Sequence, residues 1–210
     1  RRLDITVTNT PGTATDAVAE HALALTLSLA RRIPELDVRV RAGDWPRGML
    51  TQLAGKRMGI VGTGEIGMRT ARLARGIGMD VIAWTMNPSQ ERAQRLGLRF
   101  VELDDLLESS DVVSLHVRLS DETNGMIGAA ELGLMKPAAL LINTARGALV
   151  DEAALTAVLT DRSIGGAALD VFVGEPLVQK HPLVDLPNVI LSPHTAGTTA
   201  EALANGLEMV

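Results

Sequence analysis

The chain has no cysteine and no tyrosine among its 210 residues, and its only aromatic residues are two Trp and two Phe. The lack of cysteine excludes disulfides, thiolate catalysis and cysteine-ligated zinc sites, and it fits a reducing cytoplasm. So few aromatic rings offer no stacking surface for nucleic-acid bases. We therefore expect a cytoplasmic protein that does not bind nucleic acid and carries no metal site.

A basic cluster and a long hydrophobic run are also missing. The net charge is −5, which argues against nucleic acid and an anionic membrane surface as partners. The most apolar stretch, residues 22–30, is far shorter than the ~20 residues that span a bilayer. The start of the chain shows neither a basic segment nor a signal cleavage site. We expect residues 22–30 to form a buried helix of a protein that does not enter membranes.

From Lys56 onward, short apolar strands alternate with helices. Strands covered by helices on both faces lose the alternation of polar and apolar residues, as these strands do. The pattern predicts an α/β fold, a Rossmann-type doubly wound parallel sheet of about seven strands with helices on both faces. The predicted strands are 57–61, 80–84, 98–101, 112–117, 138–143, 166–171 and 188–191.

The region before Lys56 should contain a strand over residues 3–9 and a helix from about Asp16 towards Gly43, which Pro34 should kink or interrupt. Its apolar face is predicted at Ala19, Leu23, Leu27 and Ala30. The later predicted helices cover 65–76, 87–96 with Asn87 as the N-terminal cap, 104–108, 130–134 and 151–160.

Residues 62–67, Gly-Thr-Gly-Glu-Ile-Gly, carry the pattern G-x-G-x-x-G directly after a predicted strand and at the start of a predicted helix. Dinucleotide binding requires this context. Gly62 permits the tight turn, Gly64 leaves room for the pyrophosphate, and Gly67 lets the helix pack closely on the strand. The alternative is a glycine-rich turn without a ligand.

The strand after this loop lacks the acidic residue that would accept the ribose 2′-hydroxyl of NAD. Thr85 stands in that place, 23 residues after Gly62. Without that carboxylate, the 2′-phosphate of NADP would not be repelled at this position. Arg92 could reach that phosphate. The cofactor is thus predicted to be NAD or NADP.

Three side chains in the last third of the chain suggest a reaction: Arg146, Glu175 and His194. A guanidinium, a carboxylate and an imidazole can hold a 2-oxo acid and move one proton at its carbonyl. The alternatives are a surface ion-pair partner, a plain loop residue and a core histidine, respectively.

The chain resembles the D-isomer-specific 2-hydroxyacid dehydrogenases, a family that includes phosphoglycerate dehydrogenases, glyoxylate and hydroxypyruvate reductases and D-lactate dehydrogenases. The matching motifs extend over most of the chain and include 19–21 (Ala-Glu-His), 62–67, 135–137 (Met-Lys-Pro), 143–147 (Asn-Thr-Ala-Arg-Gly), 150–152 (Val-Asp-Glu), 168–172 (Ala-Leu-Asp-Val-Phe), 175–177 (Glu-Pro-Leu), 187–189 (Pro-Asn-Val) and 192–194 (Ser-Pro-His).

The resemblance implies a role for each member of this set. Arg146 would hold the substrate carboxylate and polarise its keto oxygen. His194 would exchange the proton, and Glu175 would orient its ring and favour its protonated form. Asp170 would lie at the nicotinamide carboxamide, and His116 would line the cofactor cleft.

The full set of cofactor-binding residues that the resemblance implies is Gly62, Gly64, Glu65, Ile66, Gly67, Thr85, His116, Thr144, Ala145, Arg146, Asp170, His194 and Gly197. His21 and His181 are interpreted as ordinary structural histidines.

The resemblance also implies two lobes with the active site between them. Residues 1–15 would be the last strand of the substrate lobe, 16–196 the NAD(P)-binding domain, and 197–210 the start of a helix that returns to the substrate lobe. Most of the substrate lobe would then be missing, and the chain alone would be inactive. A homodimer is expected, formed through the apolar face of residues 22–30.

The sequence thus favours an oxidoreductase that transfers a hydride between a nicotinamide cofactor and a small 2-oxo acid or D-2-hydroxy acid. One alternative is an NADH-sensing corepressor, a binding module on the same fold. Another is a dimerisation domain that has lost its ligand, which the unbroken glycine loop opposes.

Overall fold

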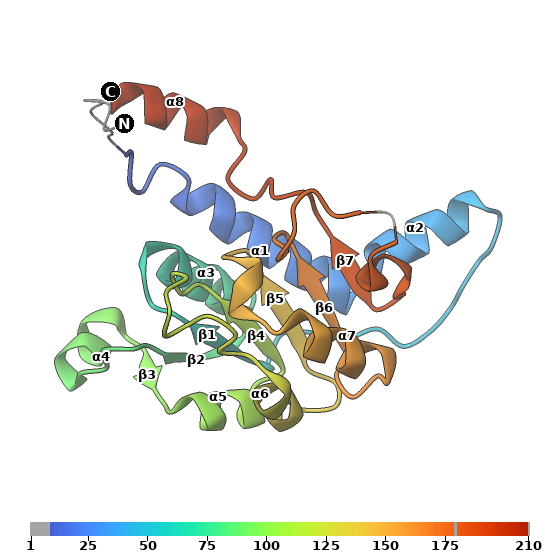
Figure 1. Cartoon of the computed structure of the whole chain (residues 1–210), viewed down its shortest axis with the longest axis horizontal. Helices are drawn as coiled ribbons and strands as arrows, with labels where there is room; N and C mark the ends of the chain where they lie inside the picture. The colour runs from blue at the N-terminus through green and yellow to red at the C-terminus, as the bar shows by residue number, and fades with distance from the viewer. Residues whose placement is uncertain (1–8, 179, 210) are drawn as a thin grey trace, which may run out of the picture.

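The computed structural model describes residues 9–178 and 180–209, and their strands form one parallel sheet of seven strands (Figure 1). The spatial order is β3-β2-β1-β4-β5-β6-β7, so the direction of winding reverses between β1 and β4. This topology confirms the predicted doubly wound sheet. The strands are β1 (Arg57–Val61), β2 (Asp80–Trp84), β3 (Arg99–Phe100), β4 (Val112–Leu115), β5 (Leu140–Asn143), β6 (Gly166–Leu169) and β7 (Val189–Leu191).

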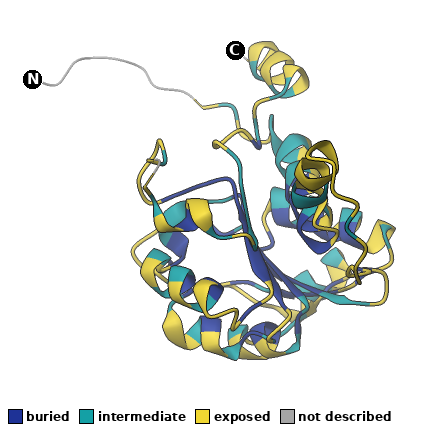
Figure 2. Cartoon of the chain, turned by 90° about the vertical axis from the view of Figure 1, so that its right-hand side faces the viewer, coloured by how far each residue is buried: buried dark blue, intermediate teal, exposed yellow. Residues whose placement is uncertain are grey.

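Helices cover both faces of the sheet, and each face has its own hydrophobic core (Figures 1 and 2). One core is completed by α1 (Thr15–Ala30) and α3 (Glu65–Gly76). The other is completed by α5 (Leu103–Ser109), α6 (Ala129–Leu134) and α7 (Glu152–Thr160). Burial on both faces explains why the strands are continuously apolar.

The helix predicted from Asp16 to Gly43 is two helices, α1 and α2 (Ile33–Arg41). The chain breaks at Arg32, whose φ of 50° is left-handed. Pro34 lies in the first turn of α2, a position where the missing N–H costs no hydrogen bond.

The apolar face predicted for the first helix was partly wrong. Leu27 is 36% exposed, and the buried positions include Ala22, Leu25 and Leu29. Leucines occupy alternate positions of this helix and therefore point to different sides of it. Periodicity alone could not select the side that packs on α3 and the sheet. Leu27 stays exposed and Leu23 half-buried on the side away from that core, so the expectation that residues 22–30 offer an apolar face to a second copy stays a prediction.

Other boundaries differ by a few residues. Ser89, rather than Asn87, caps α4 (Gln90–Leu96) by accepting a hydrogen bond at Oγ from the Arg92 N–H at 3.1 Å. Strands predicted to reach 117 and 171 end at Leu115 and Leu169. The strand predicted at 3–9 lies outside the described residues except for Asn9.

The last helix, α8 (Ala200–Glu208), stands apart from the sheet (Figure 1). Thr199 caps it, and Asn205 donates from Nδ2 to the carbonyl of Thr13 at 3.4 Å. The helix therefore lies against the segment that leads into α1. Short 3₁₀ turns complete the described structure at Gly147–Leu149 and Pro182–Asp185. In the part of the chain that the structure describes, no helix is both long and apolar enough to cross a membrane.

Candidate functional site

The candidate residues follow the strands at one edge of the sheet, because all seven strands are parallel and end on the same side. Each of these loops emerges at the carboxyl end of its strand, where doubly wound sheets bind ligands. In order of strands β1, β2, β4, β5, β6 and β7, the residues that follow them are Gly62, Thr85, His116, Thr144 to Arg146, Asp170 and His194.

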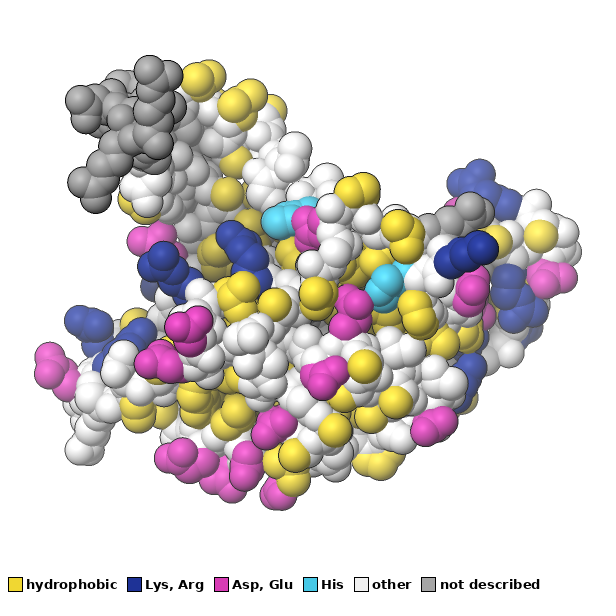
Figure 3. All heavy atoms as spheres, in the orientation of Figure 1, with side chains coloured by type: hydrophobic (Ala, Val, Ile, Leu, Met, Phe, Trp, Pro, Cys, Tyr) yellow, Lys and Arg dark blue, Asp and Glu magenta, His cyan; other side chains and the backbone are white. Residues whose placement is uncertain are grey.

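A cleft of about 640 Å³ lies at this edge. In Figure 3 the surface is hollowed below α8, with basic side chains, a histidine and an acidic side chain around the hollow. Among the predicted residues, the cleft brings together Ile66, His116, Thr144, Ala145, Arg146, Asp170, His194 and Gly197. It is also lined by Val18, Val117, Arg118, Leu119 and Ala196, which the sequence did not single out. Within residues 9–178 and 180–209, no group of three His, Asp or Glu side chains is placed to hold a metal ion.

The glycine loop, residues 62–67, has the close packing that its pattern predicts. Gly62 has φ of +104°, and a Cβ there would come within 2.7 Å of the backbone of His116. A Cβ on Gly67 would overlap the carbonyl oxygen of Gly62. By contrast, a Cβ on Gly64 would meet nothing within 4 Å. Gly62 and Gly67 therefore lie tightly against neighbouring backbone, whereas the loop is open at Gly64. The open side is at the N-terminus of α3, where a phosphate is favourably bound.

Two buried hydroxyls near the loop have no hydrogen-bond partner among the described residues, those of Thr63 and Thr144. Thr144 lines the cleft. Buried polar groups without partners are rare and call for a ligand or water. Together with the open face of Gly64, they show that the residues present fit a dinucleotide.

Thr85 is buried directly after β2, and the preceding residue, Trp84, accepts a hydrogen bond from Gly62 N–H at 2.9 Å. Arg92 on α4 spans two loops. Its guanidinium donates to the carbonyl of Thr63 at 3.2 Å and to that of Asn87 at 3.3 Å. A positive charge therefore bridges the glycine loop and the loop that follows β2, and that loop lacks the acidic residue that would accept a ribose 2′-hydroxyl.

His194 and Glu175 form a direct pair, with Nδ1 of the imidazole 2.7 Å from Oε2 of the carboxyl. Glu175 also accepts the N–H of Phe172 at 2.9 Å. The bond from His194, and then that from Phe172, hold the pKa of the Glu175 carboxyl below its usual range. The carboxylate is therefore retained to lower pH than in a free glutamate.

Arg146 lies in a turn that Asn143 fixes. The buried amide of Asn143 donates to the carbonyl of Arg146 at 2.8 Å and accepts the Ala145 N–H at 3.0 Å. A Cβ on Gly147 would overlap the backbone of Phe172, so this turn packs directly on the loop that carries Glu175. The Arg146 guanidinium itself is exposed and donates to the Ala145 carbonyl at 2.6 Å.

Asp170 is fully buried and accepts four contacts. Its Oδ1 accepts the hydroxyl of Ser192 at 2.6 Å and the N–H of Thr195 at 3.1 Å, and its Oδ2 accepts the N–H of Ala196 at 2.8 Å. The fourth contact, 3.4 Å from Oδ1, is Nε2 of His21. Such bonding compensates a buried charge that would otherwise be costly.

His116 lies at the end of β4, with Nε2 2.9 Å from the hydroxyl of Ser114. Loss of solvation lowers its pKa to about 4. The ring is therefore neutral near pH 7 and contributes no charge to the cleft.

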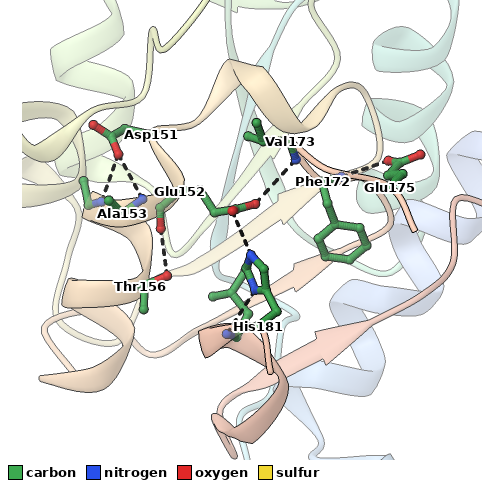
Figure 4. Close-up of polar contacts among 10 residues, drawn as sticks. Asp151, Glu152, Ala153, Thr156, Phe172, Val173, Glu175 and His181 are labelled. Atoms are coloured by element: carbon green, nitrogen blue, oxygen red, sulfur yellow. Dashed lines mark hydrogen bonds and ion pairs between the residues drawn. The ribbon is translucent and has the colours of Figure 1, made fainter. Parts of the chain in front are cut away.

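A second polar cluster supports the loop that carries Glu175 (Figure 4). Glu152 lies between His181 and Val173. One carboxylate oxygen is 2.8 Å from Nε2 of His181, and the other accepts the N–H of Val173 at 3.4 Å. His181 is thus structural, as interpreted, but sequence reasoning did not link it to this loop. The signal available in the sequence was Glu152 itself, because it belongs to the Val-Asp-Glu motif.

Comparison with known proteins identifies the family. Residues 23–196 match the sequence model described as "D-isomer specific 2-hydroxyacid dehydrogenase, NAD binding domain". The chain belongs to this family. It is 46% identical to a glyoxylate reductase of Aeropyrum pernix over 209 residues, which cover 95% of the chain and 62% of that relative.

Two solved structures are similar over the same extent. A D-lactate dehydrogenase from Lactobacillus jensenii with NAD⁺ has a TM-score of 0.87 at 32% identity, covering 98% of the chain and 66% of its own. An acyclic imino acid reductase in complex with NADPH and D-Arg has a TM-score of 0.87 at 33% identity, with the same coverage. The chain therefore spans about two thirds or less of the length of these relatives.

The open face of Gly64 generates a prediction. Gly64→Val should fill the space above the loop without touching the fold, since a Cβ there meets nothing within 4 Å. We expect the Kd for NADH to rise more than tenfold, about 1.4 kcal/mol, while the free energy of unfolding changes by less than about 1 kcal/mol. Titration by NADH fluorescence and urea unfolding would measure both.

Gly76→Ala is the matched control, because a Cβ on Gly76 also meets nothing within 4 Å but lies at the far end of α3. Unchanged NADH affinity in Gly64→Val would contradict this binding mode.

Proposed function

We propose that the chain is the coenzyme domain of an NAD(P)-dependent D-2-hydroxyacid dehydrogenase, an enzyme that interconverts a 2-oxo acid and a D-2-hydroxy acid. The observation that carries this proposal is the His194–Glu175 pair at 2.7 Å, with His194 on the same cleft as Arg146. The similarity to a glyoxylate reductase and a D-lactate dehydrogenase supports it.

The pairing of His194 assigns the two ring nitrogens. Because the Glu175 carboxylate can only accept, Nδ1 carries a proton, and Nε2 is left to exchange a proton with the substrate oxygen. Glu175 stabilises the imidazolium from which that proton leaves during reduction. The exposed guanidinium of Arg146 would hold the substrate carboxylate in two parallel bonds. When bound, the nicotinamide supplies the hydride.

The proposed substrate is a small 2-oxo acid, and the proposed division of the chain is 1–15, 16–196 and 197–210. Residues 16–196 would bind the cofactor, and the two end segments would belong to a substrate lobe. The support is the position of α8, which is separate from the sheet and contacts Thr13. Two exposed leucines of α8, Leu203 and Leu207, offer apolar surface for such a lobe.

The complete set of predicted cofactor-binding residues is kept as part of this proposal. Within it, the cofactor is NAD or NADP, and the Arg92 guanidinium, which bridges the carbonyls of Thr63 and Asn87, supports acceptance of a 2′-phosphate. A phosphate there would meet a positive charge and no carboxylate of the β2 end. We therefore propose that NADPH binds at least as well as NADH.

Arg92→Ala should raise the Kd for NADPH about tenfold more than the Kd for NADH, because only NADPH carries the extra phosphate. Parallel fluorescence titrations with the two cofactors measure this ratio. Arg95→Ala, an exposed arginine on the same helix, is the control. Equal weakening of both cofactors by Arg92→Ala would assign the arginine a purely structural role.

The corepressor alternative gains no support from the site or from the relatives. Turnover decides between the two. A protein that carries both lobes should reduce glyoxylate, hydroxypyruvate or pyruvate with NADH or NADPH, whereas a sensor would bind the cofactor without turnover.

Glu175→Gln tests the proposed chemistry directly. The substitution keeps the size of the side chain but removes the negative charge that favours the protonated ring. Reduction should slow at least tenfold, and the alkaline limb of its pH–rate profile should move to lower pH. Glu201→Gln on the exposed face of α8 is the control. A limb that stays in place would remove Glu175 from this role.

We further propose a cytoplasmic homodimer without nucleic-acid or membrane partners. Exposed apolar side chains on α2 and the segment after it, Val38, Val40, Trp45 and Met49, support association through this part of the chain, together with the exposed Leu27 of residues 22–30. Light scattering should give twice the chain mass, and Trp45→Ser with Met49→Ser should lower it. A monomeric mass at micromolar concentration would contradict the proposal.

A further inference from the structure

His21, on α1, reaches Asp170 at the edge of the candidate site in two ways: directly, with Nε2 3.4 Å from Oδ1, and more closely through one hydroxyl. Its Nε2 lies 3.1 Å from Oγ of Ser192, which in turn lies 2.6 Å from Oδ1 of Asp170. These three residues come from α1, the end of β7 and the end of β6. The function proposed above uses neither His21 nor Ser192.

The chemistry of this contact fixes the direction of its hydrogen bonds. Asp170 as a carboxylate can only accept, so the single hydroxyl proton of Ser192 is directed to Oδ1. Oγ of Ser192 must then accept from His21, which requires a proton on Nε2 of that ring. The result is a directed chain from the His21 N–H through the Ser192 hydroxyl to the Asp170 carboxylate.

Asp170 in turn holds the loop that carries His194. Thr195 and Ala196 directly follow His194. Their N–H groups donate to the carboxylate of Asp170 at 3.1 and 2.8 Å. His194 itself has φ of 54°, a left-handed conformation that an L residue adopts at a cost. Successive N–H groups after such a residue form a pocket for an anion, here the buried side chain of Asp170.

We propose that His21 and Ser192 are positioning residues. They fix the orientation of the Asp170 carboxylate, which through the N–H groups of Thr195 and Ala196 holds His194 in the conformation that presents its ring to the cleft. The inference rests on the proposed function for its catalytic consequence. The link between α1 and the loop is reinforced by Gly197, whose Cβ position would lie 3.3 Å from the side chain of Ala14.

Three variants separate this role from simple packing. Ser192→Ala removes the bridging hydroxyl, and Ser192→Thr keeps it. His21→Phe keeps an aromatic ring but removes the donor. Thr26→Val is the matched control, because Thr26 is buried on the same helix and its hydroxyl bonds within that helix, to the carbonyl of Ala22 at 2.7 Å.

The first readout needs no turnover. Amide hydrogen exchange of Thr195 and Ala196 should accelerate at least tenfold in Ser192→Ala and His21→Phe, because their acceptor loses its fixed orientation. Exchange in Ser192→Thr and Thr26→Val should stay near that of the unchanged chain. Unchanged exchange in Ser192→Ala would overturn the proposal.

The second readout is kinetic, in a protein that carries both lobes. A small displacement of His194 should lower kcat about tenfold or more, with a much smaller change in the KM for the 2-oxo acid, and Ser192→Thr should restore kcat. A loss of kcat that Ser192→Thr does not restore, or that Thr26→Val reproduces at an equal loss of stability, would also overturn it. If the unchanged protein shows no turnover, the proposed function fails, and amide exchange alone still decides whether these residues hold the loop.

Discussion

The pairing of β1 with β4 is the contact on which the candidate site depends. These strands are far apart in the sequence but run side by side, with Val61 opposite Leu115 and the His116 N–H bonded to the Val61 carbonyl at 2.7 Å. The pairing places the glycine loop and His116 together and reverses the winding of the sheet at that point. Loops on either side of the reversal diverge, and the space between them is the cleft.

The loops that carry the candidate residues are held in place by polar side chains that bond to the backbone of those loops. Asn143 fixes the turn of Arg146, Glu152 supports the loop of Glu175, and Asp170 anchors the loop of His194. Each uses backbone N–H or carbonyl groups as partners, so the loops are shaped without regular secondary structure. This second layer keeps flexible, charged side chains at defined positions, as preorganised sites require.

The sequence allowed the sheet, the glycine loop and the identity of the candidate residues to be predicted, because these leave local signals: apolar runs, a spaced glycine pattern and family motifs. It did not reveal contacts between distant segments. His21 and Ser192 are 171 positions apart, and nothing local marks their meeting. Leu27 was misplaced because leucines surround its helix, and Asn87 was chosen over Ser89 because both are good caps. Tertiary packing decides such cases.

The left-handed backbone of His194 has a consequence for how this protein would respond to selection. Glycine or asparagine would occupy φ of 54° with less strain, on the order of 1 kcal/mol. A library of variants selected only for thermal stability would therefore enrich replacements at position 194, and its most stable members would have lost the imidazole. A histidine at a backbone position that lowers stability is what the proposed proton exchange at this residue would require.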